Sequence, residues 1–195
     1  ADLIDDVIVL DRKLDAIDKR IAEAVKASDT TLTDIVGVGP VTAAAILGEV
    51  GDVARFTTAD RFASYTGTAP LEVSSGDVVR HRLSRAGNRR LNNALHIVAL
   101  SNKRHDARGK AYYERKLAAG KGKKGSLRCL KRRLSDVVFR TLVEDRARAN
   151  PGGQMGATLT ASAVDQIPKA NTSDKPQPGF TTEATPKKVL AKAAS

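Results

Sequence analysis

The sequence predicts a mainly α-helical protein, on three observations. Aromatic residues make up only 4% of the 195 residues and Trp is absent, so the core must come from Ala, Val, Leu and Ile. Apolar residues recur at helical spacing in most segments between residues 2 and 148. The single Cys excludes a disulfide framework and a cysteine zinc site. No apolar run reaches about 18 residues, so we expect neither a membrane span nor a membrane partner.

Residues 2–27 are expected to form one long helix with an apolar seam. Its apolar positions fall into two series with seven-residue spacing, offset by four: Leu3, Leu10, Ile17 and Ala24, and Val7, Leu14 and Ile21. This alternation is typical of a coiled coil, so residues 1–28 are predicted to be a coiled-coil arm that makes the chain a homo-oligomer. Ile4, Ile8 and Val25 widen the stripe, so packing onto the protein's own body is the alternative.

In residues 32–51 two apolar helical pieces are expected to flank the turn Gly37-Val38-Gly39-Pro40. Pro40 suits the first turn of the second helix. The segment resembles the helix-hairpin-helix motif, in which hairpin amides at a helix N-terminus contact a DNA phosphate. The alternative is a plain turn that joins two helices.

The remaining chain divides into a helical domain and a tail. We expect helices at 58–66, 88–103, 107–118 and 126–148, an extended or hairpin loop at 71–83, and a basic linker at 121–125. His96 falls near an apolar helix face and is expected to be structural. Residues 151–195 are rich in Ala, Thr, Ser, Pro and Lys and are expected to be disordered. The predicted domains are therefore 1–28, 29–150 and 151–195.

The positive charge lies in one block. Residues 80–140 hold 19 Lys or Arg against 3 acidic residues, whereas the rest of the chain holds 14 against 19. Such a block most often meets phosphate, so nucleic acid is the leading partner, and a solvated face or an acidic protein is the alternative. The residues expected to bind DNA are Gly37, Val38, Gly39, Arg80, Arg82, Arg85, Asn88, Arg89, Arg90, Lys123, Lys124, Arg128, Lys131 and Arg132.

Ser74 and Ser75 precede Gly76 in the predicted loop and are followed by three arginines of the basic block. A serine hydroxyl attacks only when a neighbour removes its proton or stabilises the attacked group. Guanidinium groups can do the latter by holding phosphodiester oxygens. From the spacing alone, the simpler interpretation is that both serines are turn residues.

Together these segments resemble the C-terminal transposase domain of a bacterial insertion-sequence family that includes the pilin-gene invertase. The resemblance covers about residues 1–150 and includes residues 35–47, 62–70, Ser75-Gly76 and 84–91. It implies DNA transposition or site-specific recombination by a catalytic serine, which by position is Ser75, with Ser74 as the fallback. It also implies a DNA partner and, in some members, a structured guide RNA.

The family's N-terminal half resembles a resolvase, carries metal-binding acids and would use a divalent metal such as Mg²⁺. That half has no counterpart in this sequence, so enzymatic activity of this chain by itself stays open. We expect the C-terminal part of a longer transposase, acting in the bacterial cytoplasm at the nucleoid. The alternative is a non-catalytic nucleic-acid-binding or dimerisation remnant.

Overall fold

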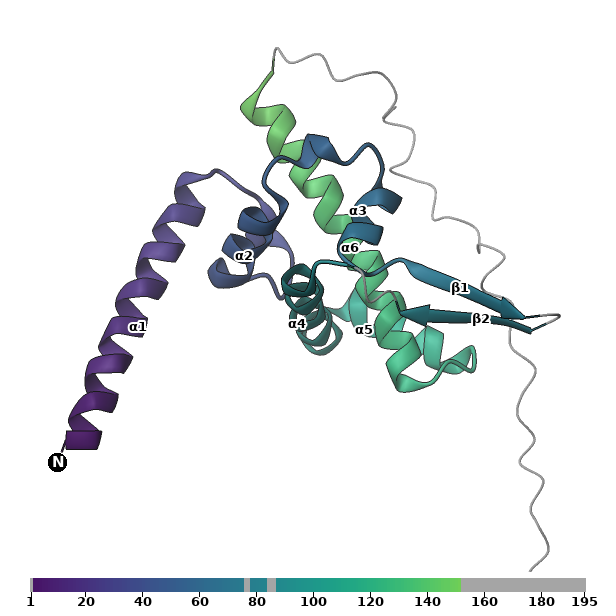
Figure 1. Ribbon diagram of the computed structural model, residues 1–195, viewed down its shortest axis with the longest axis horizontal. Coiled ribbons are helices and arrows are strands. Elements are labelled where there is room, and N and C mark those ends of the chain that lie inside the picture. Colours follow the sequence, from purple (N-terminus) through teal and green to yellow (C-terminus); the bar gives the residue numbers. More distant parts are fainter. Residues whose placement is uncertain (1, 76–77, 84–86, 152–195) are drawn as a thin grey trace, which may run out of the picture. The chain divides into compact units, whose positions relative to one another are not determined.

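The computed structural model describes the backbone of residues 2–75, 78–83 and 87–151, and side chains within residues 3–71 and 87–151. The chain divides into two units, residues 1–159 and 160–195, and every described residue lies in the first. That part holds six α-helices, two short 3-10 helices and one hairpin (Figure 1), which confirms the prediction of a mainly α-helical protein. None of these helices is long and apolar enough to cross a membrane. The prediction of a disordered tail falls almost wholly outside the described residues.

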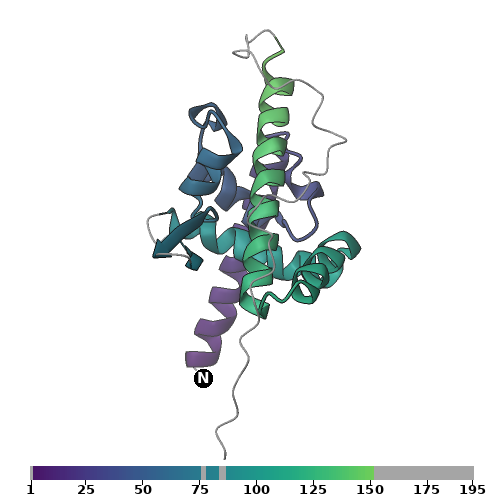
Figure 2. The same ribbon diagram turned by 90° about the vertical axis from the view of Figure 1, so that its right-hand side faces the viewer.

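Helix α6 (Lys123–Ala149) is the element on which the domain is assembled (Figure 2). The elements packed against it are α3 (Ala59–Tyr65), α4 (Arg89–His105), α5 (Ala107–Ala118), η1 (Leu32–Asp34) and η2 (Val53–Arg55). Its buried apolar residues are Leu130, Leu134, Val138, Phe139 and Leu142. Leu130, Leu134, Val138 and Leu142 follow one another at four-residue spacing and Phe139 lies beside them, so α6 buries a continuous stripe along one side.

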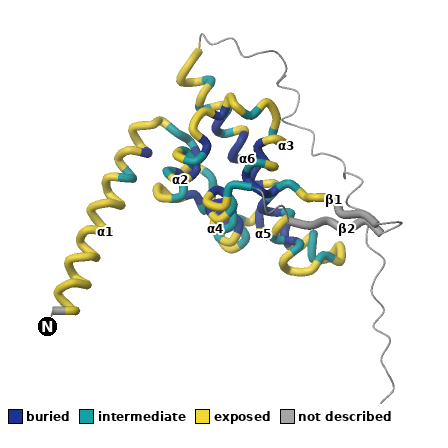
Figure 3. Tube along the Cα trace, viewed as in Figure 1, coloured by how far each residue is buried: buried dark blue, intermediate teal, exposed yellow. Residues whose placement is uncertain are grey.

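The core is mainly aliphatic but has an aromatic centre that the composition did not predict. Phe62 is fully buried, and its ring centroid lies 5.2 Å from that of Phe56 and 5.4 Å from that of Phe139. These distances are typical of favourable aromatic pairs. The three rings join α3, α6 and the residue that follows η2. Figure 3 shows buried backbone, in dark blue, along α3 and α6.

Helix α1 (Asp2–Ala27) has the predicted bounds, and only its end packs on the domain. Val25 is buried and Ile21 packs against the core, while α1 contacts α2 (Pro40–Val50). The earlier seam residues are exposed, from Leu3 at 82% to Ile17 at 48%. Packing onto the body therefore accounts for the last turns alone, and pairing of the exposed seam stays a prediction.

Residues 70–83 form a regular antiparallel hairpin, in agreement with the hairpin alternative of the extended or hairpin loop predicted at 71–83. Strand β1 (Pro70–Ser75) pairs with β2 (Val78–Leu83), from Pro70 opposite Leu83 to Ser75 opposite Val78. Ser74 and Ser75 are thus the last residues of a strand and do not lie in the loop itself. The turn residues, 76 and 77, lie outside the described residues.

Two helix boundaries differ from prediction for local reasons. Helix α6 begins at Lys123, because Gly122 takes the cap position and its carbonyl accepts from the Ser126 amide at 2.9 Å. Lys123 and Lys124 therefore lie in a helical turn, not in a linker. The first helical piece before Gly37 is only the single 3-10 turn η1, so the helix-hairpin-helix motif stays a prediction.

Candidate nucleic-acid interface

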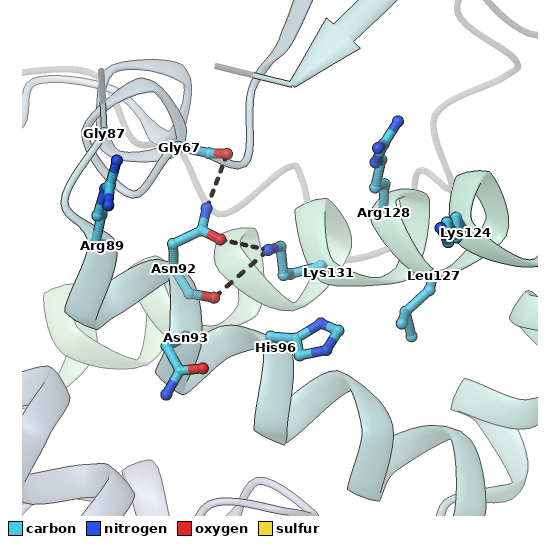
Figure 4. Close-up of a pocket in the computed structure, with 10 residues that line it drawn as sticks. All are labelled: Gly67, Gly87, Arg89, Asn92, Asn93, His96, Lys124, Leu127, Arg128 and Lys131. Carbon is cyan, nitrogen blue, oxygen red and sulfur yellow. Dashed lines mark hydrogen bonds between the residues drawn. The ribbon is translucent and has the colours of Figure 1, made fainter. Parts of the chain in front are cut away.

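Two rows of side chains face each other across a pocket of about 670 Å³ between α4 and α6 (Figure 4). The α4 row is Arg89, Asn92, Asn93 and His96, and the α6 row is Lys124, Leu127, Arg128 and Lys131. Both rows have the spacing i, i+3, i+4, i+7, which puts each on one face of its helix. Gly67 and Gly87 complete the lining, just before β1 and just after β2. The pocket therefore lies at the base of the hairpin that carries Ser74 and Ser75.

The pocket is strongly basic. Four of its ten lining residues are Lys or Arg and none of the ten is acidic. Arg89, Lys124 and Arg128 are exposed, so their charges face solvent at the mouth of the pocket. Concentrated positive charge in a concave site attracts phosphate.

Lys131 differs from the three exposed cations of the pocket, because it is buried and only 6% exposed. Its Nζ donates to Oδ1 of Asn92 at 2.7 Å and to the Asn92 carbonyl at 3.4 Å. Burial lowers the pKa of Lys131, and the neighbouring charge of Arg128 lowers that pKa further. A buried ammonium needs such partners, and the same two hydrogen bonds hold the Asn92 side chain in place.

Asn92 is also hydrogen-bonded to the backbone at the base of the hairpin. Its Nδ2 donates to the carbonyls of Thr66 and Gly67 at 2.9 and 3.0 Å. Here two chain segments cross in backbone contact: a Cβ on Gly87 would lie 2.4 Å from the nitrogen of Gly67. Gly67 has a φ of +66°, which favours glycine. Asn92 thus links the pocket wall on α4 to the segment before the hairpin, which Gly87 approaches closely.

Asn88 fixes the first turn of α4 and with it the position of Arg89. Its Oδ1 accepts from the amides of Arg90 and Leu91, and its Nδ2 donates to Glu49 at 2.7 Å. The hydrogen bond from Asn88, with a smaller contribution from Arg90, holds the pKa of Glu49 below its ordinary 4.5. Both the Oδ1 and the Nδ2 of Asn88 therefore make hydrogen bonds within the domain, and its role in DNA binding stays a prediction.

The predicted site residues of the hairpin are placed only by their backbone. Ser74 pairs with Val79, Arg80 with Val73 and Arg82 with Leu71. Arg85 lies outside the described residues. The hairpin brings Ser74, Ser75, Arg80 and Arg82 into one two-stranded unit that starts at the pocket.

The predicted hairpin amides at Gly37, Val38 and Gly39 lie at the start of α2. Gly37 has a φ of +95° and packs on α4, where a Cβ would meet that of Ser101 at 2.8 Å. Val38 is buried and its amide donates to the Ile35 carbonyl at 2.9 Å. Gly39 is the exposed cap residue of α2. The amide of Val38 is therefore engaged in a hydrogen bond within the turn and does not point to a phosphate.

The remaining predicted cations divide into two groups. Arg90 lies 3.2 Å from Glu49, and Arg132 pairs with Asp60 at 2.6 Å and with Asp136 in the next turn. These two arginines are partly neutralised within the domain. Lys123 is exposed in the first turn of α6, beside Lys124 of the pocket. The structure therefore brings Arg89, Lys124, Arg128 and Lys131 together.

Asn92, Asn93 and His96 were not predicted as site residues. His96, which was expected to be structural, is half-buried and lines the pocket, and its role stays a prediction. The sequence does place these three residues on the same helix face as Arg89, because they continue its helical spacing. The facing row on α6 could not be predicted, since sequence spacing does not say which helices pack together.

The divalent metal that the resemblance implies is expected in the family's N-terminal half, and not among the residues of this sequence. Among the residues that the structure describes, no three His, Cys, Asp or Glu side chains are grouped so that they could hold a metal ion. We therefore derive no step through a metal from these residues, and the expected metal site stays a prediction about protein outside this chain.

This chain is similar to a transposase family and to proteins of bacterial insertion elements. Residues 29–114 match the family described as Transposase IS116/IS110/IS902 family. The chain is 39% identical over 112 residues to the insertion element IS110 uncharacterized 43.6 kDa protein of Streptomyces coelicolor, covering 57% of this chain and 28% of that protein. It is 31% identical over 167 residues to the insertion element IS900 uncharacterized 42 kDa protein of Mycobacterium paratuberculosis, covering 84% of this chain and 40% of that protein.

A third relative is the insertion element IS116 uncharacterized 44.8 kDa protein of Streptomyces clavuligerus, 30% identical over 149 residues. The chain spans at most 40% of the length of these three relatives. The matching segments include the pocket row on α4 and both strands of the hairpin. The chain is thus similar to insertion-element proteins over much of its length, and its residues 29–114 match the transposase family.

Proposed function

We propose that this chain is the DNA-binding, serine-bearing part of a transposase that exchanges DNA strands. The observation that carries the proposal is the basic pocket at the base of the hairpin that ends in Ser74 and Ser75. A phosphate held by Arg89, Lys124 and Arg128 puts the DNA backbone beside that hairpin. Such contacts position the duplex without reading its sequence.

The pocket supplies the electrostatic part of DNA binding. If six to ten basic residues contact phosphates, affinity falls by roughly 10³–10⁵ between 50 and 200 mM salt. The test is the fluorescence anisotropy of a labelled duplex and of a structured RNA, titrated across a salt series. The RNA arm asks whether a guide RNA is also bound.

The matched variants for this test carry the same change in charge. The triple variant Arg89→Gln, Lys124→Gln, Arg128→Gln should reduce the slope of log K against log salt by up to about 2.7, at about 0.9 for each lost contact. The control Arg12→Gln, Lys19→Gln, Lys26→Gln lies on α1 and should leave the slope within about 1. Equal slopes in both triple variants would show that the pocket does not hold phosphate.

The proposed chemistry is a transesterification at Ser75. The serine Oγ attacks a DNA phosphorus, an Oγ–P bond forms, and the bond from phosphorus to one deoxyribose oxygen breaks. The proton lost by the serine is balanced by the one gained by the released sugar hydroxyl. A hydroxyl of another strand then reverses these steps, so the exchanged strand is rejoined without an external energy source.

Ser75→Ala separates chemistry from binding. We expect it to abolish the covalent protein–DNA adduct on a denaturing gel, with the N-terminal half of a relative supplied in trans, while duplex affinity stays within about twofold. Ser74→Ala should leave the adduct intact, and the reverse result would move the role to Ser74. An adduct that survives both substitutions would exclude a serine mechanism.

A further inference from the structure

The pocket between α4 and α6 is larger than a phosphate group requires. Its volume of about 670 Å³ falls within the range of about 300–1,000 Å³ that is typical of sites for small organic molecules. Two of its lining residues, His96 on α4 and Leu127 on α6, are half-buried. An imidazole ring and an aliphatic side chain therefore form part of its wall, in addition to the cations.

The cations of the pocket are distributed unevenly. Three of the four are exposed: Arg89, Lys124 and Arg128. The fourth, Lys131, is buried, and its Nζ donates to Oδ1 of Asn92 at 2.7 Å. In Figure 4 the two arginines lie in the upper part of the view, and His96 and Leu127 lie below them. Exposed positive charge therefore surrounds the mouth, whereas the part lined by His96 and Leu127 suits an uncharged group.

A nucleotide has the same division of chemistry. Its phosphate is charged and binds at basic side chains, whereas its base is flat, uncharged and able to stack on a ring. Bases that leave a duplex are held by stacking on aromatic and apolar side chains. Histidine is one of the residues on which unpaired bases stack. The two parts of the pocket thus correspond to the two parts of a nucleotide.

We propose that the pocket binds an unpaired nucleotide of DNA, at a bulge or extruded from the duplex. The base stacks on the imidazole of His96 and covers Leu127, while its flanking phosphate lies at the exposed cations of the mouth. The inference rests on the DNA binding proposed above and specifies the part of the substrate that enters the pocket. Strand exchange requires base pairs to open, so a site that holds an open base stabilises DNA in the state that the exchange needs.

The test compares the affinities of three short duplexes of one sequence. The first is fully paired, the second has a single unpaired adenine, and the third has an abasic nucleotide in place of that adenine. We expect the unpaired adenine to raise affinity over the fully paired duplex by about 5- to 100-fold, as for one stacked base, and the abasic duplex to lose this gain. Because stacking releases no counterions, the ratio of affinities should change little between 50 and 200 mM salt.

Variants at His96 locate the base. His96→Gln removes the ring but keeps a polar side chain, and it should reduce the preference for the unpaired adenine to less than about twofold. His96→Phe keeps an aromatic face and should retain the preference. His105→Gln is the matched control, because His105 is exposed at the end of the same helix and outside the pocket lining. It should keep the wild-type preference, and circular dichroism confirms that each variant is folded.

Two results would overturn this site and leave phosphate binding at the pocket intact. One is equal affinity of the wild type for all three duplexes, while the triple variant of the three exposed cations still has a reduced salt slope. The other is a preference for the unpaired adenine that survives His96→Gln. Failure of all three duplexes to bind at low salt would overturn this inference together with the proposed DNA binding.

Discussion

Gly87 and Gly67 show how single residues position the candidate site. Their backbones cross in close contact at the base of the hairpin, beside the pocket. Asn92 of α4 donates hydrogen bonds to the carbonyls of Thr66 and Gly67 at this crossing. Asn92 in turn is held by the buried ammonium of Lys131. A short polar chain thus runs from α6 through α4 to the hairpin that carries the serines.

Gly87→Ala should destabilise the domain. The new Cβ would lie 2.4 Å from the nitrogen and 2.5 Å from the Cα of Gly67, and backbone atoms cannot rotate away as a side chain could. We expect the free energy of unfolding to fall by about 1–3 kcal/mol, as for other overpacked sites. Urea unfolding followed by circular dichroism measures this change.

Gly48→Ala is the control for that prediction. Gly48 lies inside α2, and a Cβ there would meet nothing within 4 Å. Because alanine favours helix more than glycine does, we expect a gain of about 0.5–1 kcal/mol. Equal effects of the two substitutions would mean that the close crossing at Gly87 does not constrain the fold.

At the scale of elements, the end of α1 is tied to α6 through one carboxylate. Asp145 accepts hydrogen bonds from the hydroxyls of Thr30 and Thr31 at 2.7 and 2.6 Å and from the Thr31 amide at 3.0 Å. Arg148 pairs with the same carboxylate from the next turn of α6. This cluster fixes the start of the chain segment that leads to α2.

Asp145 should make stability depend on pH in the acid range. Burial by itself would raise its pKa, but the hydrogen bonds from Thr31, Thr30 and Arg148 together lower it below the ordinary 3.8. The carboxylate therefore stabilises the fold above about pH 4, and that contribution is lost as the pH falls through the lower pKa of the folded state. We expect Asp145→Asn to cost about 1 kcal/mol at pH 7 and to flatten the loss of stability below pH 4.

The measurement is urea unfolding between pH 2.5 and 7. Glu144→Gln removes a charge from the adjacent exposed residue of α6 and should leave the acid limb unchanged. If the wild type and Asp145→Asn lose stability in parallel below pH 4, the link between this cluster and acid stability is wrong.

At the scale of the whole molecule, the exposed seam of α1 is the feature that a single chain leaves unexplained. Apolar residues from Leu3 to Ile17 face solvent along most of the helix. Exposed apolar residues at heptad spacing are typical of a helix that pairs with a copy of itself. We propose that α1 makes this protein a homo-oligomer.

Charged residues in the seam should separate the oligomer. We expect Leu10→Glu with Ile17→Glu to reduce the mass found by light scattering to that of one 20.7 kDa chain. Arg12→Gln with Lys19→Gln changes the charge equally at positions outside the seam and should keep the wild-type mass. A wild-type protein that is already monomeric at tens of micromolar would contradict the proposal.

The sequence by itself determined most of the helices. Helices α1 and α5 have the predicted bounds, and α3 and α4 differ from prediction by at most two residues at each end. Helical periodicity and caps such as Thr58 and Asn88 are local signals, so the sequence shows them. The basic block was visible in the same way, since charge is a property of composition. The strand at residues 70–75 was less visible, because its pairing partner, not its own pattern, makes it a strand.

Only the tertiary structure decided which residues form the pocket. The rows on α4 and α6 are more than 25 residues apart in the sequence, and each has a spacing that would fit any polar helix face. Their meeting depends on how α3, α4 and α6 pack around Phe62, and the crossing of Gly67 and Gly87 depends on the hairpin between them. Local patterns fix the elements because their causes lie within a few residues, whereas the site is fixed by long-range packing that no local pattern contains.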